Sequence, residues 1–97
     1  MKLYLISQTL VEDYDTYDSA VVAAEDEQKA RETHPCQFVT HHNGKKWMGT
    51  FAQSGEEYDM NSGRDWPSFE RIDCIQVEYL GETDHPAGVV LASFNAG

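Results

Sequence analysis

The chain has 97 residues, 40% of them hydrophobic, which is enough for one domain over residues 1–97 with a modest core. Its 17 acidic residues outnumber its 7 basic residues and give a formal net charge of −10. This charge disfavours direct binding to DNA, RNA or an anionic membrane, because phosphate contacts need clustered Lys and Arg. It suits plain solubility or a partner with a basic surface.

The cysteines and the apolar runs indicate an intracellular protein. Cys36 and Cys74 lack CxxC spacing, and we expect no signal peptide, so reduced thiols are the default. The longest apolar runs are far shorter than the ~20 residues that a membrane helix needs.

Hydrophobic patterning predicts two strands and a helix in the first part of the chain. Residues 3–7 form an apolar run, and residues 19–24 form a second run without charge. The polar segment 8–18 lies between them, so we expect the two strands to pair as a hairpin. Residues 26–34 are rich in helix formers, with acids first and bases last, and Pro35 ends this short helix.

The middle of the chain is less regular. Residues 37–42 are predicted to form a strand, and the Asn43-Gly44 pair after it is a strong hairpin signal. The return strand is expected over residues 45–51. Residues 52–65 contain Gly, Ser, Asn and acids, which predicts a loop.

The last third of the chain completes the expected sheet. One helical turn is predicted over residues 66–72. Residues 75–79 alternate between apolar and polar side chains, as a half-buried strand does, and residues 88–94 form an apolar last strand. Together these elements predict an α+β domain: a mostly antiparallel sheet of four to six strands with one short helix packed on one face.

Both ends of the chain carry distinctive strings: KLYLISQ at 2–8, YDTYDSAVVAA at 14–24, HP at 34–35, VEYLG at 77–81 and GVVLASFNAG at 88–97. These strings resemble a family of small, mostly uncharacterised proteins from tailed phages and prophages. The resemblance weakens between Cys36 and Ser68 and includes no catalytic motif. It implies a phage or mobile-element gene and a place in the host cytoplasm. Small acidic proteins in that context often inhibit host defence, as anti-CRISPR and anti-restriction proteins do, and some imitate the charge of DNA.

Runs of acidic residues form the main candidate binding surface. A groove that normally neutralises phosphates accepts carboxylates through the same electrostatics. Tyrosines among acids make good contacts for Arg-rich partners. The ordinary alternative is a solvated face with helix-start acids. The candidate contact residues are Asp13, Asp15, Asp18, Glu25, Glu27, Glu56, Glu57 and Asp59, together with Tyr14 and Tyr17.

The histidines and cysteines raise two further hypotheses, a zinc site and a Cys/His nucleophile. The residues concerned are His34, Cys36, His41 and His42, with Cys74 and His85 as residues that could join them in space. Their spacing matches no zinc-finger pattern, and the chain has no nucleophile elbow, phosphate-binding glycine loop or HExxH helix. We therefore predict no metal, no cofactor and no enzymatic activity.

The sequence thus predicts a phage-encoded acidic inhibitor that binds and occludes a basic surface of a host nucleic-acid-targeting defence protein. Two alternatives stay open: a small metal- or ligand-binding accessory protein, and a homo-oligomeric phage structural protein with an apolar interface. The large aromatic residues are expected to anchor the core or the loops, and would mark an interface if exposed together. They are Trp47, Phe51, Trp66 and Phe69.

Overall fold

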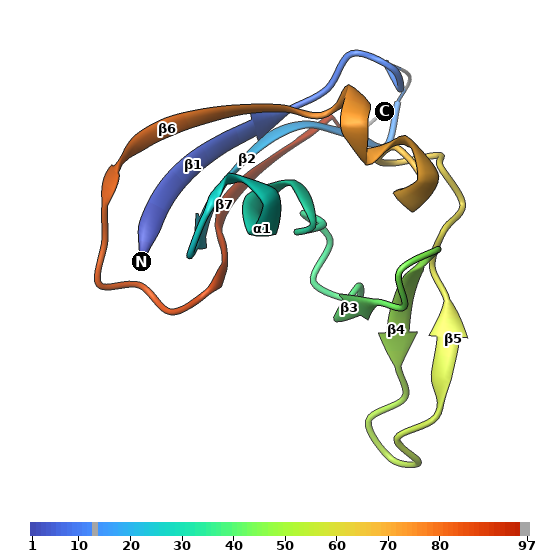
Figure 1. Ribbon diagram of the computed structural model, residues 1–97. Helices are drawn as coiled ribbons and strands as arrows, with labels where there is room; N and C mark the ends of the chain where they lie inside the picture. The colour runs from blue at the N-terminus through green and yellow to red at the C-terminus, as the bar shows by residue number, and fades with distance from the viewer. Residues whose placement is uncertain (13, 96–97) are drawn as a thin grey trace.

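A computed structural model describes residues 1–12 and 14–95, which form mainly two antiparallel β-sheets (Figure 1). The larger sheet has the strand order β6-β1-β2-β7 and the smaller sheet has the order β3-β4-β5. The strands are β1 (Lys2–Ser7), β2 (Thr16–Ala24), β3 (His41–His42), β4 (Trp47–Thr50), β5 (Glu57–Asp59), β6 (Gln76–Glu82) and β7 (Gly88–Asn95), and the helices are α1 (Glu27–Arg31) and the 3-10 helix η1 (Phe69–Cys74). The predicted antiparallel pairing is confirmed.

The predicted hairpin between the first two strands is the centre of the larger sheet. Ile6 lies opposite Ala20, and Tyr4 lies opposite Val22. All four side chains are buried, because they point to the face that α1 covers. Burying apolar side chains on one face only is what fixes the register of a strand pair, since a slip by one residue would expose them.

Helix α1 is shorter than predicted. Asp26 caps its first turn by accepting a hydrogen bond from the Lys29 N–H at 2.8 Å, and Ala30 is its buried residue. The helix ends at Arg31 instead of continuing to Pro35, and His34 turns into the core. Helical structure in the described residues is limited to α1 and η1, so the fold is predominantly β and the predicted α+β class is met only in part. Neither helix is long and apolar enough to cross a membrane.

The middle of the chain departs most from the prediction. The loop expected over residues 52–65 contains strand β5, which pairs with β4 so that Gly49 faces Tyr58. The expected strand over residues 37–42 is reduced to β3 at its last two residues. As a result, the strands form a second sheet instead of extending one sheet of four to six strands.

The Asn43-Gly44 turn between β3 and β4 is confirmed. Gly44 has a φ of 86°, a left-handed conformation that glycine adopts without strain. The Asn43 Oδ1 accepts hydrogen bonds from the N–H groups of Lys45 and Lys46, which holds the turn closed.

The last strands agree with the prediction, whereas the helical turn before them begins later than expected. β6 and β7 contain the predicted runs 75–79 and 88–94 almost entirely. η1 begins at Phe69, because the Phe69 N–H donates to the Asn61 Oδ1 at 2.7 Å and fixes the start of the turn there.

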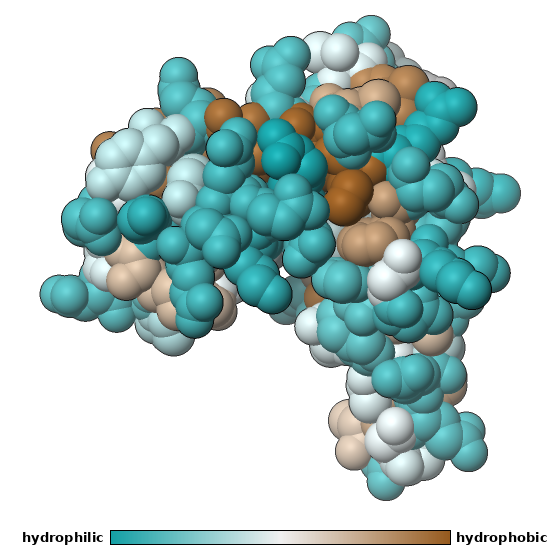
Figure 2. Space-filling model, viewed as in Figure 1, coloured by the Kyte–Doolittle hydropathy of each residue, from teal (hydrophilic) through white to brown (hydrophobic). Residues whose placement is uncertain are grey.

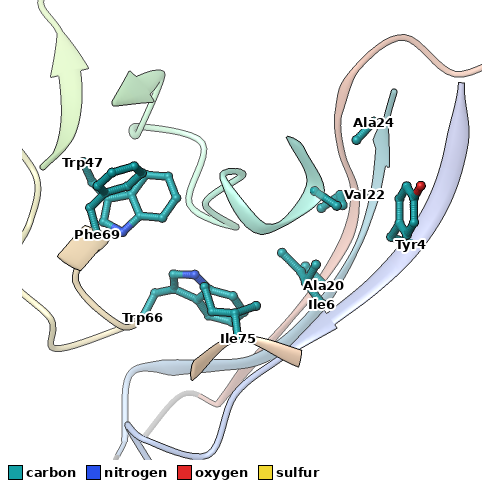
Figure 3. Packing of buried hydrophobic residues seen from close by; sticks show 10 residues of the cluster. Tyr4, Ile6, Ala20, Val22, Ala24, Trp47, Trp66, Phe69 and Ile75 are labelled. Atoms are coloured by element: carbon teal, nitrogen blue, oxygen red, sulfur yellow. The ribbon is translucent and has the colours of Figure 1, made fainter. Parts of the chain in front are cut away.

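Two tryptophans join the two sheets. Trp47 from β4 and Trp66 from the segment before η1 are each 1% exposed. The Trp47 Nε1 donates to the Pro67 carbonyl at 3.0 Å, and its ring meets that of Phe69 edge-on at 5.1 Å. Figure 3 shows Trp66 and Ile75 beside the buried side chains of the larger sheet, with Trp47 and Phe69 beyond them. The prediction that Trp47, Trp66 and Phe69 anchor the core is confirmed.

Replacing each tryptophan by phenylalanine isolates the Trp47 hydrogen bond. Trp47→Phe leaves the Pro67 carbonyl without its donor, whereas the Trp66 Nε1 has no hydrogen-bond partner within the described residues. We expect Trp47→Phe to lower the free energy of unfolding by about 1–3 kcal/mol more than Trp66→Phe does. Urea denaturation of both variants measures the difference, and equal losses would show that the hydrogen bond contributes nothing.

Candidate functional site

The predicted partner-contact residues lie in three separate places. β2 runs for nine residues, so its two ends are roughly 25 Å apart at the usual rise of a strand. The uncharged residues 19–24 lie between them. The predicted contact acids within the described residues therefore form three groups and not one continuous row. They are the β2-start acids (Asp15, Asp18), the β2-end acids (Glu25, Glu27) and the hairpin acids (Glu56, Glu57, Asp59). Asp13 lies outside the described residues.

Of the β2-start acids, Asp15 lies in the turn before β2 and Asp18 lies in the strand itself. Asp15 has a φ of 60°, a left-handed conformation that Asp tolerates better than most residues, and its N–H donates to the Asn95 carbonyl. Asp15, Asp18 and the neighbouring Tyr14 are exposed, Tyr14 by 70%. These three residues are therefore open to solvent.

Tyr17 anchors this end of β2 and is only partly exposed. Its ring packs against Phe94 at 4.8 Å and against His34 at 6.4 Å. Burial raises the pKa of Tyr17, and the neighbouring Cys36 and Asp65 raise it further. Of the two predicted contact tyrosines, Tyr14 is therefore the one at the surface.

The β2-end acids lie where α1 begins. Glu25 is exposed, and Glu27 forms an ion pair with Arg31 at 3.6 Å along the helix. Lys2 lies opposite both Ala24 and Glu82, so Glu82 of β6 reaches the same end of the sheet. The sequence analysis missed Glu82, because only the register of three neighbouring strands places it there.

A hollow adjoins the β2-end acids. It has a volume of about 520 Å³ and lies between α1 and the strands β1 and β6. The rings of Tyr4 and Tyr79 meet edge-on at 5.8 Å in its wall, and the Tyr79 hydroxyl donates to Glu82 at 3.1 Å. Tyrosine faces beside carboxylates suit a cationic side chain.

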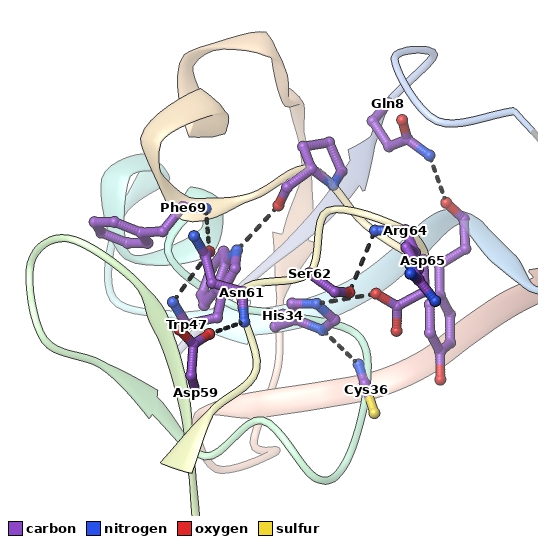
Figure 4. Close-up of polar contacts among 12 residues, drawn as sticks. Gln8, His34, Cys36, Trp47, Asp59, Asn61, Ser62, Arg64, Asp65 and Phe69 are labelled. Carbon is purple, nitrogen blue, oxygen red and sulfur yellow. Dashed lines mark hydrogen bonds and ion pairs between the residues drawn. The ribbon is translucent and has the colours of Figure 1, made fainter. Parts of the chain in front are cut away.

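The hairpin acids are engaged within the hairpin formed by β4 and β5. The Glu57 Oε1 lies 2.8 Å from the His41 Nε2, and Lys46 donates to the Asp59 Oδ2 at 3.1 Å. The N–H of Asn61 holds the pKa of Asp59 below its usual value, and Lys46 adds to that effect. Figure 4 shows Asp59 next to Asn61. Two of the three hairpin acids thus have structural partners.

The hairpin stands away from the rest of the molecule (Figure 1). Figure 2 shows it as a narrow extension of a surface that is mostly hydrophilic around α1. The Tyr58 ring covers Gly49 so closely that a Cβ there would lie 2.6 Å from the Tyr58 Cε2, so any other residue at this position would displace the ring. Tyr58 also packs on Phe51 at 4.5 Å, and Phe51 is 54% exposed. Phe51 is therefore not part of the core, and it anchors the hairpin through Tyr58.

His34 is a core residue. It is 5% exposed and lies between the rings of Trp47 and Trp66. Its Nδ1 accepts a hydrogen bond from the Cys36 backbone N–H at 3.0 Å, and its Nε2 lies 3.9 Å from the Asp65 Oδ1 (Figure 4). Burial lowers the pKa of His34 to about 4 and raises the pKa of Asp65. The imidazole is therefore neutral at pH 7.

The described residues do not assemble the donor set of a zinc site. Within 1–12 and 14–95, no three His, Cys, Asp or Glu side chains come together as ligands. His41 contacts Glu57, and His42 lies 3.5 Å from Glu32, so the two neighbouring histidines have different acidic partners. Both cysteines are free thiols, Cys36 partly buried and Cys74 exposed.

The Cys/His nucleophile has no geometric support either. The His34 Nδ1 is occupied by the backbone N–H of Cys36, and the Cys36 thiol interacts with the Tyr17 hydroxyl instead. A base that activates a thiol must accept the thiol proton directly or through one water. In this arrangement His34 does not act as a base toward the Cys36 thiol.

Comparisons of the chain with protein-family models, with curated proteins and with solved structures found no match.

The low pKa of His34 predicts acid sensitivity. An ordinary His in an unfolded chain has a pKa near 6.5. As the pH falls from 7 to 5, His34 therefore becomes protonated in the unfolded state but stays neutral in the folded state. The contribution of His34 to the free energy of unfolding is therefore complete above pH 6.5 and is lost as the pH drops toward 4. We expect the free energy of unfolding to decrease by about 2 kcal/mol between pH 7 and pH 5 from this residue.

Urea denaturation at several pH values measures the effect. His34→Gln should flatten the dependence above pH 5, whereas His85→Gln, at an exposed position, should leave it unchanged. The raised pKa of Asp65 acts in the opposite direction, but in the carboxylate range at lower pH. An unchanged slope in His34→Gln would contradict the assignment.

Proposed function

We propose that the protein binds and occludes a basic surface of a host protein that targets nucleic acids, and that it is not an enzyme. The distribution of charge carries this proposal. Residues 12–32 contain eight acids and two bases, whereas residues 41–61, which include the hairpin, contain three acids and two bases. The excess of negative charge therefore lies with the larger sheet and α1, and the hairpin is close to neutral.

Three exposed acids support a binding role for this part of the molecule. Among the described residues, Asp15, Asp18 and Glu25 form no ion pair. No internal ion pair has to be broken when these carboxylates meet a basic surface. Their charge also attracts a basic partner over long range and speeds association. The hairpin acids Glu57 and Asp59 already have partners in His41 and Lys46.

The spacing of the two acid groups favours occlusion. With roughly 25 Å between the ends of β2, the groups suit two basic patches on either side of a groove. The sheet between them would then fill the groove and exclude nucleic acid by its bulk. The uncharged residues 19–24 do not continue a phosphate-like row, so the proposal needs no detailed imitation of DNA.

The resemblance to phage proteins directs the proposal to a host defence protein. Proteins that cut or bind foreign nucleic acid carry grooves rich in Arg and Lys. Such a groove provides the basic patches, and its occlusion would block the binding or cutting of nucleic acid. The proposed partner is therefore a component of a CRISPR or restriction system.

Capture of a partner from host lysate tests the proposal. The tagged protein is incubated with bacterial lysate at low and at moderate salt, and bound proteins are identified by mass spectrometry. We expect a basic nucleic-acid-binding protein that elutes as salt rises, because salt screens exposed charges. Binding that does not depend on salt, or no partner at either salt, would contradict the proposal.

Charge-neutral variants then locate the surface. Asp15→Asn/Asp18→Asn and Glu25→Gln/Glu27→Gln should each weaken binding of the captured partner at least tenfold at low salt. Glu56→Gln/Glu57→Gln removes the same charge from the hairpin and serves as the matched control, with an expected change under twofold. Equal weakening by all three pairs would point to net charge alone and sink the assignment to the two ends of β2.

A further inference from the structure

The turn between β3 and β4 gathers reactive groups around one side-chain amide. Asn43 precedes Gly44, which has no side chain to shield its backbone nitrogen. Nothing lies within 4 Å of the position that a Gly44 Cβ would take. The Gly44 nitrogen is therefore open on that side, and its attack on the Asn43 amide carbon would close a five-membered succinimide ring.

A histidine contacts this nitrogen. The Gly44 N–H donates to the His42 Nδ1 at 3.0 Å, so the imidazole lies where a general base must lie to take that proton. The His42 Nε2 lies 3.5 Å from the Glu32 Oε1. A neutral imidazole that accepts at Nδ1 carries its proton on Nε2, where it faces this carboxylate, so the two contacts require the same tautomer.

Aromatic residues hold the His42 ring in this orientation. The ring stacks on Phe69 with the centroids 4.4 Å apart and meets Trp47 edge-on at 6.4 Å. Glu25 and Lys29 line the hollow beside the ring and are its further charged neighbours. The His42 side chain is 29% exposed, so water reaches the site. A base that other groups orient is the arrangement that activates a weak nucleophile.

Two backbone N–H groups bind the amide oxygen on which charge develops when the Gly44 nitrogen attacks. The Asn43 Oδ1 accepts from the N–H of Lys45 at 2.9 Å and from the N–H of Lys46 at 2.8 Å. Fixed donors of this kind stabilise a developing oxyanion. Both bonds are made to the oxygen, and neither holds the nitrogen that must leave. They also fold the Asn43 side chain over the backbone that follows it.

We propose that Asn43 is a self-modification site, at which the folded turn converts the asparagine to aspartate or isoaspartate. The Gly44 nitrogen gives its proton to the His42 Nδ1 and bonds to the Asn43 Cγ. The Cγ–Nδ2 bond then breaks, and the proton on His42 passes to the departing nitrogen, which leaves as ammonia. Water opens the succinimide at either carbonyl. The steps need no oxidant or reductant.

The products change the charge and the shape of the turn. Each product places a new carboxylate beside Lys45 and Lys46. The isoaspartate product also adds a methylene to the main chain and shortens the side chain, so the bonds that close the turn are lost. This inference concerns the turn before β4 and not the acids at the ends of β2, so it stands or falls independently of the proposed function.

Deamidation of the purified full chain in two states tests the proposal. The chain is incubated at neutral pH, once folded and once unfolded in urea, and peptide mapping by mass spectrometry follows the loss of the Asn43 amide. We expect this loss to be at least threefold faster in the folded chain. Asn61 is the internal reference, because its Nδ2 donates to Glu70 at 2.9 Å, and it should keep its amide. An equal or slower loss at Asn43 in the folded chain would overturn the proposal.

Two neighbouring histidines provide a matched pair of variants. His42→Gln removes the base and should slow the loss in the folded chain at least fivefold, whereas His41→Gln removes the histidine that contacts Glu57 and should change it less than twofold. Loss in the unaltered chain should level off with rising pH where His42 is neutral, whereas loss in His42→Gln should keep rising with hydroxide. Circular dichroism verifies folding, and an unchanged rate in His42→Gln would disprove the role of this base.

Glu32 acts through His42 and is a positioning residue. Because a carboxylate favours the protonated imidazole, Glu32→Gln should lower the pH at which the loss levels off. The rate at that plateau should fall less than it does in His42→Gln, since the base is still present. A pH profile identical to that of the unaltered chain would contradict the role of Glu32.

Discussion

The burial of Trp47 is the interaction on which the rest of the structure depends. The indole is the largest side chain that the smaller sheet contributes to the core, and its N–H reaches the Pro67 carbonyl in the segment before η1. His34, which follows α1, packs edge-on against the same ring at 5.1 Å. One side chain thus ties the three-stranded sheet to the connection after α1 and to the segment before η1. Without the buried Trp47, the hairpin of β4 and β5 would have few apolar contacts and would be at most marginally stable.

Electrostatic repulsion is the second constraint, and the fold accommodates it by placement. Acids gather at the two ends of the larger sheet and at the start of α1, where water screens them. The interior of the described residues receives instead a histidine that burial keeps neutral. The hairpin balances its acids with Lys46 and His41, so it projects without adding much charge. Most of the net charge is therefore carried by the segments around the larger sheet and α1.

The sequence predicted those parts of the fold that depend on local pattern. The β1–β2 hairpin, the Asn43-Gly44 turn and the last two strands follow from hydrophobic period and turn chemistry. β5 escaped prediction because two of its three residues are acids, and its pairing depends on β4 and on Lys46 from elsewhere in the chain. The helix was predicted too long because His34, which looks like a helix end, is needed in the core.

The candidate site was predicted by composition but not by arrangement. The acids were identified as a class, yet their division into three groups depends on the length of β2 and on the position of the hairpin. Glu82 joins the β2-end acids only through the pairing of β6 with β1. The His/Cys cluster was close in sequence, but His34 turns inward and His41 turns to Glu57, so proximity along the chain did not become proximity of donors.

The position of the tryptophans has a consequence for spectroscopy. The chain has two, and both lie in the joint between the sheets with the His34 ring beside them. Their fluorescence therefore reports one event, the entry of water into that joint. Fraying of the far end of β6 would leave the emission unchanged, so a shift of its maximum identifies a change in this joint.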